Sequence, residues 1–454
     1  IPSTLSYGKH PFSITFNDPE GQPLLKNLSN IVFEFVDSRG TIIFSKDQKK
    51  WPRTGNGKKA QVLECLHFYN CNNMVFTSSG KGLIDGQGAG WWGIPGIGYL
   101  ELGENRPRLF NMENGQHNLV ENIILKNSPY WTFWAHGVEY LEVRNVDISA
   151  RRTDHDGHDI IDLSAFNTDG FDVAGDYVWI HDCTVWNQDD CVCAKDGSTN
   201  MLFERINASG VGLTIGSIGS STNRNITFRD IYMHNTYKGI YMKFRDLNHG
   251  GIVEDILYEN IVIDNPEQWP IWIGPAQQSD SDNLCAAHPC SICWPKLPEK
   301  VAPCYSASGR YINITLRNIT VNNPQMHPGV IFGNLTTPME NLVFDNVKFN
   351  ELVDKTFKNI VKDGFSDAQI DAALYQLEMG KREISSGSLP YGLQILLSMA
   401  PGSLYKSDPL ILASVDEALN RLKERVKDKG YLNKLVDDLF ISNNHRVNLE
   451  MVPD

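Results

Sequence analysis

A short apolar pattern recurs through the middle of this chain of 454 residues. In each copy, apolar and polar residues alternate, a short break follows, and a second alternating pair completes the unit. The first residues of the second pair are Ile123, Val146, Cys183, Ile206, Ile231, Ile261, Ile319 and Val347. Alternation with a period of two indicates strands, because successive side chains of a strand point to opposite faces.

The spacing of the copies predicts how these strands assemble. The shortest spacing is 23 residues, as between Ile123 and Val146, and the longer ones contain insertions. One such unit cannot bury its apolar face alone, whereas stacked units bury a continuous apolar column. We therefore predict an all-β fold, a right-handed parallel β-helix. A leucine-rich repeat would need a leucine signature that the copies lack, and a propeller needs about 40 residues per blade.

After the last copy the pattern becomes helical. A capping box at Ser366 predicts a helix that ends near Gly380. A second capping box predicts a helix over residues 415–429, with Gly430 as its C-terminal stop. This part could cover the open edge of the last coil.

We expect two domains, a parallel β-helix over residues 1–354 and a mainly helical C-terminal extension over residues 355–454. The formal net charge of −13 argues against a nucleic-acid partner, because phosphate contacts need clustered Lys and Arg. No stretch of 18 apolar residues occurs, so no membrane partner is expected.

Cysteines and glycosylation signals favour a secretory route. Four of the nine cysteines crowd together, and we expect them to form two disulfides; the alternative is a zinc site that includes His288. These four are Cys285, Cys290, Cys293 and Cys304. Six Asn-x-Ser/Thr sequons lie at Asn27, Asn207, Asn225, Asn313, Asn318 and Asn334. The chain begins Ile-Pro-Ser without Met, which fits a mature protein after signal-peptide removal. We therefore expect an extracellular glycoprotein.

Three aspartates occur at the spacing of the coils. Asp169 and Asp190 are 21 residues apart, and Val211 follows after another 21. Coils of that length stack these positions about 4.8 Å apart. Asp169, Asp189 and Asp190 should therefore meet in one groove. Crowded carboxyl groups repel one another and one keeps its proton, which is the acid–base arrangement that hydrolysis of a glycosidic bond requires.

These aspartates lie in motifs that resemble glycoside hydrolase family 28, the polygalacturonase family. The motifs are Asn167-Thr168-Asp169, Gln188-Asp189-Asp190 and the glycine-rich stretch 210–217. The resemblance covers roughly residues 60–350. It implies a β-helix enzyme that inverts anomeric configuration and needs no metal or other cofactor. It also implies that Asp189 is the general acid and that Asp169 and Asp190 hold and activate the water.

The chain departs from the family at two motif positions. Val211 stands where the family usually has histidine, and Tyr241 replaces the arginine of its Arg-Ile-Lys motif. Lys243 keeps the lysine, and Arg245 could restore a guanidinium on the same strand face. With Gln188 and Asn167, these two basic residues are the substrate-binding residues that we expect.

Aromatic and histidine side chains are less specific signals. Six tryptophans could stack on sugars, and we expect one or two to face the groove: Trp91, Trp92, Trp131, Trp134, Trp269 and Trp272. Three histidines, His155, His158 and His181, are expected on the surface or in turns.

The sequence therefore predicts a secreted, monomeric glycoside hydrolase that acts on an acidic, pectin-like polysaccharide. One alternative is a polysaccharide lyase on the same fold, with calcium bound by Asp169 and Asp190. Another is a carbohydrate-binding protein without catalysis, which the lost histidine and arginine favour and the intact set of aspartates opposes.

Overall fold

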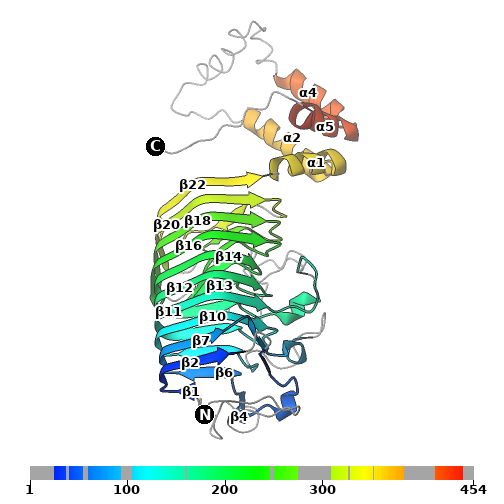
Figure 1. Ribbon diagram of the computed structural model, residues 1–454. Coiled ribbons are helices and arrows are strands. Elements are labelled where there is room, and N and C mark those ends of the chain that lie inside the picture. Colours follow the sequence, from blue (N-terminus) through cyan, green and yellow to red (C-terminus); the bar gives the residue numbers. More distant parts are fainter. Residues whose placement is uncertain are drawn as a thin grey trace. The chain divides into compact units, whose positions relative to one another are not determined.

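The computed structural model describes residues 25–36, 40–54, 60–93, 105–158, 161–245, 250–274, 308–325, 328–350, 352–382 and 415–442. The chain divides between Asn350 and Glu351 into two compact units. The first consists of strands stacked coil upon coil, and the second contains helices (Figure 1).

The first unit contains one continuous 20-stranded sheet in which strands pair in parallel with those of the next coil. Ten long strands form its main wall: β2 (Ser29–Phe35), β7 (Asn72–Ser78), β10 (Gln116–Lys126), β11 (Phe133–Ser149), β12 (Phe171–Trp186), β14 (Thr199–Ser209), β16 (Thr222–His234), β18 (Ile252–Asp264), β20 (Arg310–Asn322) and β22 (Glu340–Asn350). The prediction of a parallel β-helix is confirmed.

Short strands form a second wall, which carries the candidate site. They are β1 (Leu25–Lys26), β6 (Leu66–Tyr69), β9 (Phe110–Glu113), β13 (Val192–Ala194), β15 (Leu213–Ile218), β17 (Ile240–Phe244), β19 (Ile271–Ile273) and β21 (Gly329–Ile331). The first residues of β11 and β12 join this wall between β9 and β13. At the N-terminal end, β3 (Thr41–Ile43) pairs with β8 (Gly82–Asp85), and β4 (Arg53–Thr54) pairs antiparallel with β5 (Gln61–Val62).

The repeat seen in the sequence builds the core. Seven of its eight marker residues are almost completely buried: Ile123, Val146, Cys183, Ile206, Ile231, Ile261 and Ile319. Aromatic rings stack beside them, as where Phe228 lies 4.7 Å from both Phe203 and Tyr258. Because each coil covers the apolar face of the previous one, the buried column is continuous.

Asparagines occupy the bends of the coils, as their left-handed tolerance suggests. Asn200, Asn225 and Asn318 all have a φ between 51° and 55°. Their amides bond from coil to coil, with Asn225 Nδ2 donating to Asn200 Oδ1 at 2.7 Å. In the same way, Asn318 Nδ2 donates to Asn260 Oδ1 at 3.0 Å. Two of these residues, Asn225 and Asn318, are sequon asparagines, so they have a structural role whether or not they carry a glycan.

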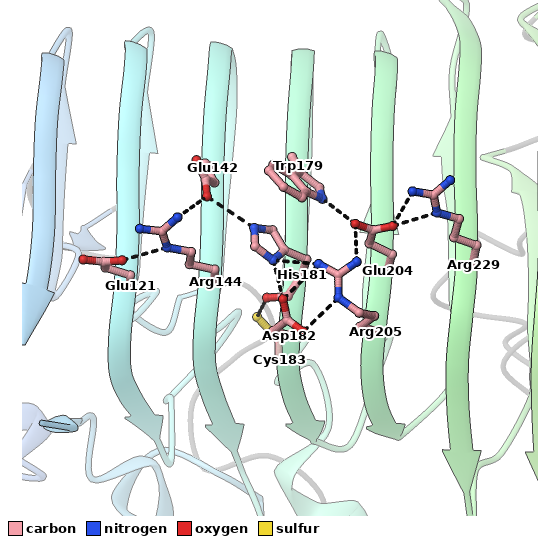
Figure 2. A network of polar contacts seen from close by, with 10 residues as sticks. All are labelled: Glu121, Glu142, Arg144, Trp179, His181, Asp182, Cys183, Glu204, Arg205 and Arg229. Atoms are coloured by element: carbon pink, nitrogen blue, oxygen red, sulfur yellow. Dashed lines mark hydrogen bonds and ion pairs between the residues drawn. The ribbon is translucent and has the colours of Figure 1, made fainter.

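A ladder of charged residues crosses the long strands (Figure 2). Its members are register partners in successive coils: Glu121, Arg144, His181, Glu204, Arg229, Glu259, Arg317 and Asp345. Arg144 binds Glu121 at 2.7 Å, and Arg229 binds Glu204 at 2.6 Å. Such cross-strand pairs each contribute a fraction of a kcal/mol and favour this register.

The second unit consists of α1 (Leu352–Asp363), α2 (Asp367–Arg382), α4 (Val415–Arg425), α5 (Lys429–Val436) and a π-type turn (Asp437–Ile441). The capping box is confirmed, since Gln369 N donates to Ser366 Oγ at 3.3 Å. Our prediction that Gly430 ends a helix is wrong. Asp428 caps a new helix there, because its carboxylate accepts from Gly430 N at 2.9 Å. None of the described helices is long and apolar enough to span a membrane.

The described residues include five cysteines, all buried with free thiols: Cys65, Cys71, Cys183, Cys191 and Cys193. The four cysteines of the expected disulfide cluster, and His288, lie outside the described residues. The disulfides therefore stay a prediction.

Candidate active site

The three aspartates meet as the coil spacing predicts. Asp169 and Asp190 each precede a strand by two residues, and the strands they precede pair Phe171 with Val192. The turns themselves are bonded, since Gly170 N donates to Asp190 O at 2.8 Å. Carboxylate oxygens of Asp169, Asp189 and Asp190 lie within 4.8 Å of one another. Their exposed fractions are only 4%, 8% and 1%.

Two lysines neutralise this cluster. Lys243, from β17, lies with its Nζ 3.0 Å from Asp190 Oδ2. Lys195, which follows β13, reaches Asp172 Oδ1 at 2.9 Å, Asp169 Oδ2 at 3.5 Å and Asp190 Oδ2 at 3.9 Å. Each lysine is three residues beyond the start of its short strand. They therefore reach the same carboxylates from different coils.

Asp172 and Lys195 are site residues that our sequence reasoning missed. The signal was present in the pattern, because Asp172 is three residues after Asp169, and Lys195 has the same offset from its strand as Lys243. Thr214 was also missed, and its Oγ1 donates to Asp190 Oδ1 at 2.9 Å. The position of a residue relative to its short strand would therefore have identified site residues that the motifs did not include.

The surroundings divide the carboxyl groups into two kinds. Burial, together with the charges of Asp169 and Asp190, raises the pKa of Asp189 well above its usual value. Burial and the charge of Asp172 likewise raise the pKa of Asp169. Burial also opposes ionisation of Asp190, but the ammonium groups of Lys243 and Lys195 outweigh it and lower the pKa of Asp190. Asp190 therefore loses its proton more readily than Asp189.

Asn167 holds the carboxyl group of Asp189 in place. Its backbone N and its Nδ2 donate to Asp189 Oδ2 at 3.2 and 3.3 Å. The residue itself has a left-handed φ of 60°, and buried Arg106 donates to its Oδ1 at 3.1 Å. The other oxygen of Asp189 accepts from Asp190 N at 2.9 Å. The contacts described for Asn167 therefore orient the acid, and substrate binding by this residue stays a prediction.

Gln188 is completely buried and bonds inside the protein. Its Oε1 lies 2.9 Å from His158 Nδ1, and its backbone N donates to Thr168 Oγ1 at 3.1 Å. The other ring nitrogen of His158 contacts Ser209 Oγ at 2.9 Å. His158 thus joins two successive turns of the site. We propose that Gln188 positions the Asp189 turn and does not contact the substrate.

Our expectation for two of the three histidines is wrong. His158 and His181 are buried, with exposed fractions of 3% and 6%, because each is enclosed by hydrogen-bonding partners. His155 is exposed, as expected. His158 lies in an insertion between two copies of the repeat, so the repeat spacing could not predict its position.

Of the predicted basic residues, Lys243 is close to the aspartates and Arg245 is an exposed residue just beyond β17. Lys243 is buried, and its ammonium group donates to the carboxylate of Asp190. Tyr241, at the position of the family's arginine, is buried with its ring centre 4.2 Å from Lys243 Nζ. Uronate binding by Lys243 and Arg245 stays a prediction.

The turn after Ser209 is tight because of Gly210. A Cβ there would lie 2.4 Å from Asn187 Oδ1 and 2.7 Å from Asp189 O. Only glycine fits against the turn that carries the acid. The next residue, Val211, is half-buried and packs with Tyr241, Trp269 and Trp272, so this side of the site is apolar.

His158 makes stability depend on pH. Burial lowers the pKa of His158 to about 4, so the native chain keeps it neutral while the unfolded chain protonates it below about 6.5. Stability from this group is present above that value and is lost as the pH falls towards 4. Lowering the pH from about 7 to about 4.5 should cost about 2–3 kcal/mol. Urea unfolding of the native chain and His158→Gln at both pH values measures the difference.

The matched control is His155→Gln, at an exposed histidine, which should leave the pH dependence unchanged. If His158→Gln lost as much stability on acidification as the native chain, the neutral state of His158 would be refuted.

The sequence profile of glycosyl hydrolases family 28 matches residues 36–297, more than half of the chain and all of the aspartate cluster. This chain belongs to glycosyl hydrolases family 28. Endopolygalacturonase I of Aspergillus aculeatus is 30% identical over 197 residues, which are 42% of this chain and 49% of that protein. A probable rhamnogalacturonase E of Aspergillus flavus is 36% identical over 192 residues, 41% of this chain and 38% of that protein.

The matches to these family 28 relatives span half of their length or less. Among solved structures, the endo-xylogalacturonan hydrolase of Aspergillus tubingensis is similar with a TM-score of 0.49 and 18% identity. That similarity covers 71% of this chain and 82% of the other.

Proposed function

We propose that this family 28 chain is a glycoside hydrolase that cleaves an acidic, pectin-like polysaccharide. The observation that supports this most directly is the meeting of Asp169, Asp189 and Asp190 within 4.8 Å, with the pKa of Asp189 raised and that of Asp190 lowered. A protonated acid donates to the leaving oxygen, and an ionised base removes a proton from the attacking water. The names of the relatives support a pectic substrate.

We assign Asp189 as the general acid and Asp190 as the base. Asp190 is ionised beside Lys243 and accepts from Thr214, which leaves it oriented but charged. Asp169 has a raised pKa, so we propose that it holds the water through a hydrogen bond while Asp190 takes the proton. The family resemblance implies only that Asp169 and Asp190 together hold and activate the water; here the two residues have different roles.

We further propose that the reaction inverts the anomeric configuration, as the family resemblance implies. Inverting enzymes usually hold their two carboxyl groups about 6.5–9.5 Å apart and retaining enzymes about 5–5.5 Å apart. The aspartate oxygens here come within 4.8 Å, so separation alone would favour retention. The anomer released first, followed by NMR during early hydrolysis, decides between the two.

A lyase on this fold is disfavoured by charge. Calcium prefers several carboxylate oxygens, but the ammonium groups of Lys195 and Lys243 already lie 2.9–3.9 Å from the carboxylates of Asp172, Asp169 and Asp190. A cation between them would face two positive charges, one of them the buried ammonium group of Lys243. A purely binding protein would have no need of a protonated acid beside an ionised base.

Hydrolysis is tested by incubating the protein with homogalacturonan, rhamnogalacturonan and an algal anionic glycan. We expect new reducing ends from a pectic substrate without ultraviolet absorption from an unsaturated product. Ultraviolet-absorbing products would indicate the lyase. Binding without turnover by both the native chain and Asp189→Asn would indicate the non-catalytic protein.

We also propose that the protein is secreted and acts as a monomer. The six sequons and the polysaccharide substrate support an extracellular location. Treatment of the natural protein with an endoglycosidase, followed by mass measurement, tests whether it passed through the secretory route.

A further inference from the structure

An insertion between β11 and β12 brings a histidine to the turn that carries Asp189. The repeat markers Val146 and Cys183 are 37 residues apart, whereas the shortest spacing is 23 residues. His158 lies in the extra residues, and its side chain is only 3% exposed. The roles proposed for the three aspartates do not involve it. A histidine that an insertion buries at the site therefore needs an explanation that the coil itself does not give.

The insertion is fixed to an earlier coil. Gly93 N donates to Ser164 O at 3.1 Å, and Arg152 Nη2 donates to Gly93 O at 2.7 Å. Within the insertion, Arg152 N donates to Asp162 Oδ1 at 2.7 Å, and Asp162 is 1% exposed. These bonds hold the described parts of the insertion together and to the earlier coil. His158 therefore projects from a fixed support.

The imidazole of His158 joins the Asp189 turn to the turn that follows it. Its Nδ1 lies 2.9 Å from Gln188 Oε1, and its Nε2 lies 2.9 Å from Ser209 Oγ. An amide oxygen only accepts hydrogen bonds, so Nδ1 carries the ring proton and the neutral Nε2 accepts from Ser209. The ring also packs against Tyr237, with the two ring centres 4.4 Å apart. Both ring nitrogens are therefore used within the protein.

Gln188 depends on His158 for its orientation. The residue immediately precedes Asp189 and is completely buried. Its Nε2 has no hydrogen-bond partner among the described residues, so the contact of Oε1 with His158 is the polar contact described for its side chain. Its backbone N is fixed separately, by Thr168 Oγ1 at 3.1 Å. A rotation of the turn would move the side chains of Gln188 and Asp189 together, so a fixed Gln188 restrains the carboxyl group.

We propose that His158 is a positioning residue for the general acid, because it holds the Asp189 turn through Gln188. The proposal rests on the proposed hydrolase function. A general acid must lie within hydrogen-bond reach of the leaving oxygen, and a displacement of about 1 Å can slow a reaction about 10²-fold. His158 acts on this geometry and does not touch the substrate. Its loss should therefore affect the chemical step and leave substrate binding intact.

The test compares two leaving groups. His158→Ala should lower kcat on the pectic substrate about tenfold, with a change in KM below about twofold, because a mobile acid protonates the leaving oxygen less often. On an oligosaccharide with a nitrophenol leaving group, which needs no proton, the loss should shrink to less than about threefold. General damage to the site would lower both rates to the same extent.

Two conservative variants separate the contacts of the imidazole. The amide of Asn has a nitrogen where histidine has Nδ1, and the amide of Gln has one where histidine has Nε2. His158→Asn should keep the bond to Gln188 and at least about half of the native kcat, whereas His158→Gln, which keeps only the contact with Ser209, should resemble His158→Ala. The matched control is His155→Ala, at an exposed histidine of the same insertion, which should hydrolyse normally. Thermal unfolding shows which variants are folded, and the Asn and Gln pair decides if His158→Ala is not.

Hydrogen exchange separates this inference from the hydrolase function. In His158→Ala the backbone amides of residues 187–191 should exchange faster than in the native chain, whether or not a glycan is cleaved. If the native chain cleaves no glycan and this exchange rises, the hold on the turn stands and the hydrolase function falls. If the exchange is unchanged, if both substrates lose rate equally, or if His158→Ala keeps the native kcat, the positioning role is refuted.

Discussion

Asp189→Asn should lower the hydrolysis rate about 10³-fold with little change in KM, within the range of about 10²–10⁴ typical for a lost general acid. The reason is chemical, because an amide cannot protonate the leaving oxygen. Its fold should persist, since an Asn oxygen can still accept from Asp190 N, as Asp189 does at 2.9 Å. The amide of the new residue would face the donors of Asn167, which costs about 1 kcal/mol. Initial rates on the pectic substrate that the native chain hydrolyses measure the loss.

A leaving group that needs no proton separates this role from general damage. Asp189→Asn should regain much of its rate on an oligosaccharide with a nitrophenol leaving group, whereas Asp190→Asn should not. The matched control is Asp182→Asn, at a half-exposed aspartate that contacts His181 of the ladder (Figure 2). Asp182→Asn should hydrolyse normally. More than a tenth of native activity in Asp189→Asn would refute its role as acid.

Lys243→Met should weaken both stability and activity. It leaves the carboxylate of Asp190 buried without its nearest counter-charge, and breaking a buried ion pair costs about 3–5 kcal/mol. Lys195 remains at 3.9 Å, so we expect the lower end of that range. Urea unfolding measures the loss. If Lys243→Met does not fold, the same measurements are made on Lys243→Arg, which keeps the positive charge.

Lys243→Met should also change the pH dependence of activity. In the native chain the pKa of Asp190 is lowered, so the base becomes protonated, and activity is lost, only at acidic pH. Without Lys243 that pKa rises, and the acidic limb of kcat/KM should move to higher pH. Lys243 also lowers the pKa of Asp189, so the alkaline limb, which we assign to Asp189, should shift to higher pH as well.

The control for this variant is Lys81→Met. Lys81 forms a surface ion pair with Asp147, which typically contributes less than about 1 kcal/mol. It should leave both the stability and the pH profile nearly unchanged. An acidic limb that stays in place in Lys243→Met would contradict the assignment of Asp190 as the base.

The sequence predicted the coil and the meeting of the aspartates because both follow from local periodicity. Alternation placed Ile123 and Val146 inside, and the 21-residue spacing of Asp169 and Asp190 stacked their turns. The error at Gly430 also has a local cause. Glycine both ends helices and fits a first turn, and only the cap by Asp428 selects between them.

Which residues act around the aspartates was decided by the tertiary structure. Lys195 comes from another coil and His158 from an insertion, and they reach the site only after the coils stack. The same holds for protonation, because burial and the distances to the lysines set which carboxyl group is charged. By itself, the sequence determined that three acidic side chains would meet. The packing around them decided that the pKa of Asp190 is lowered and that of Asp189 is raised.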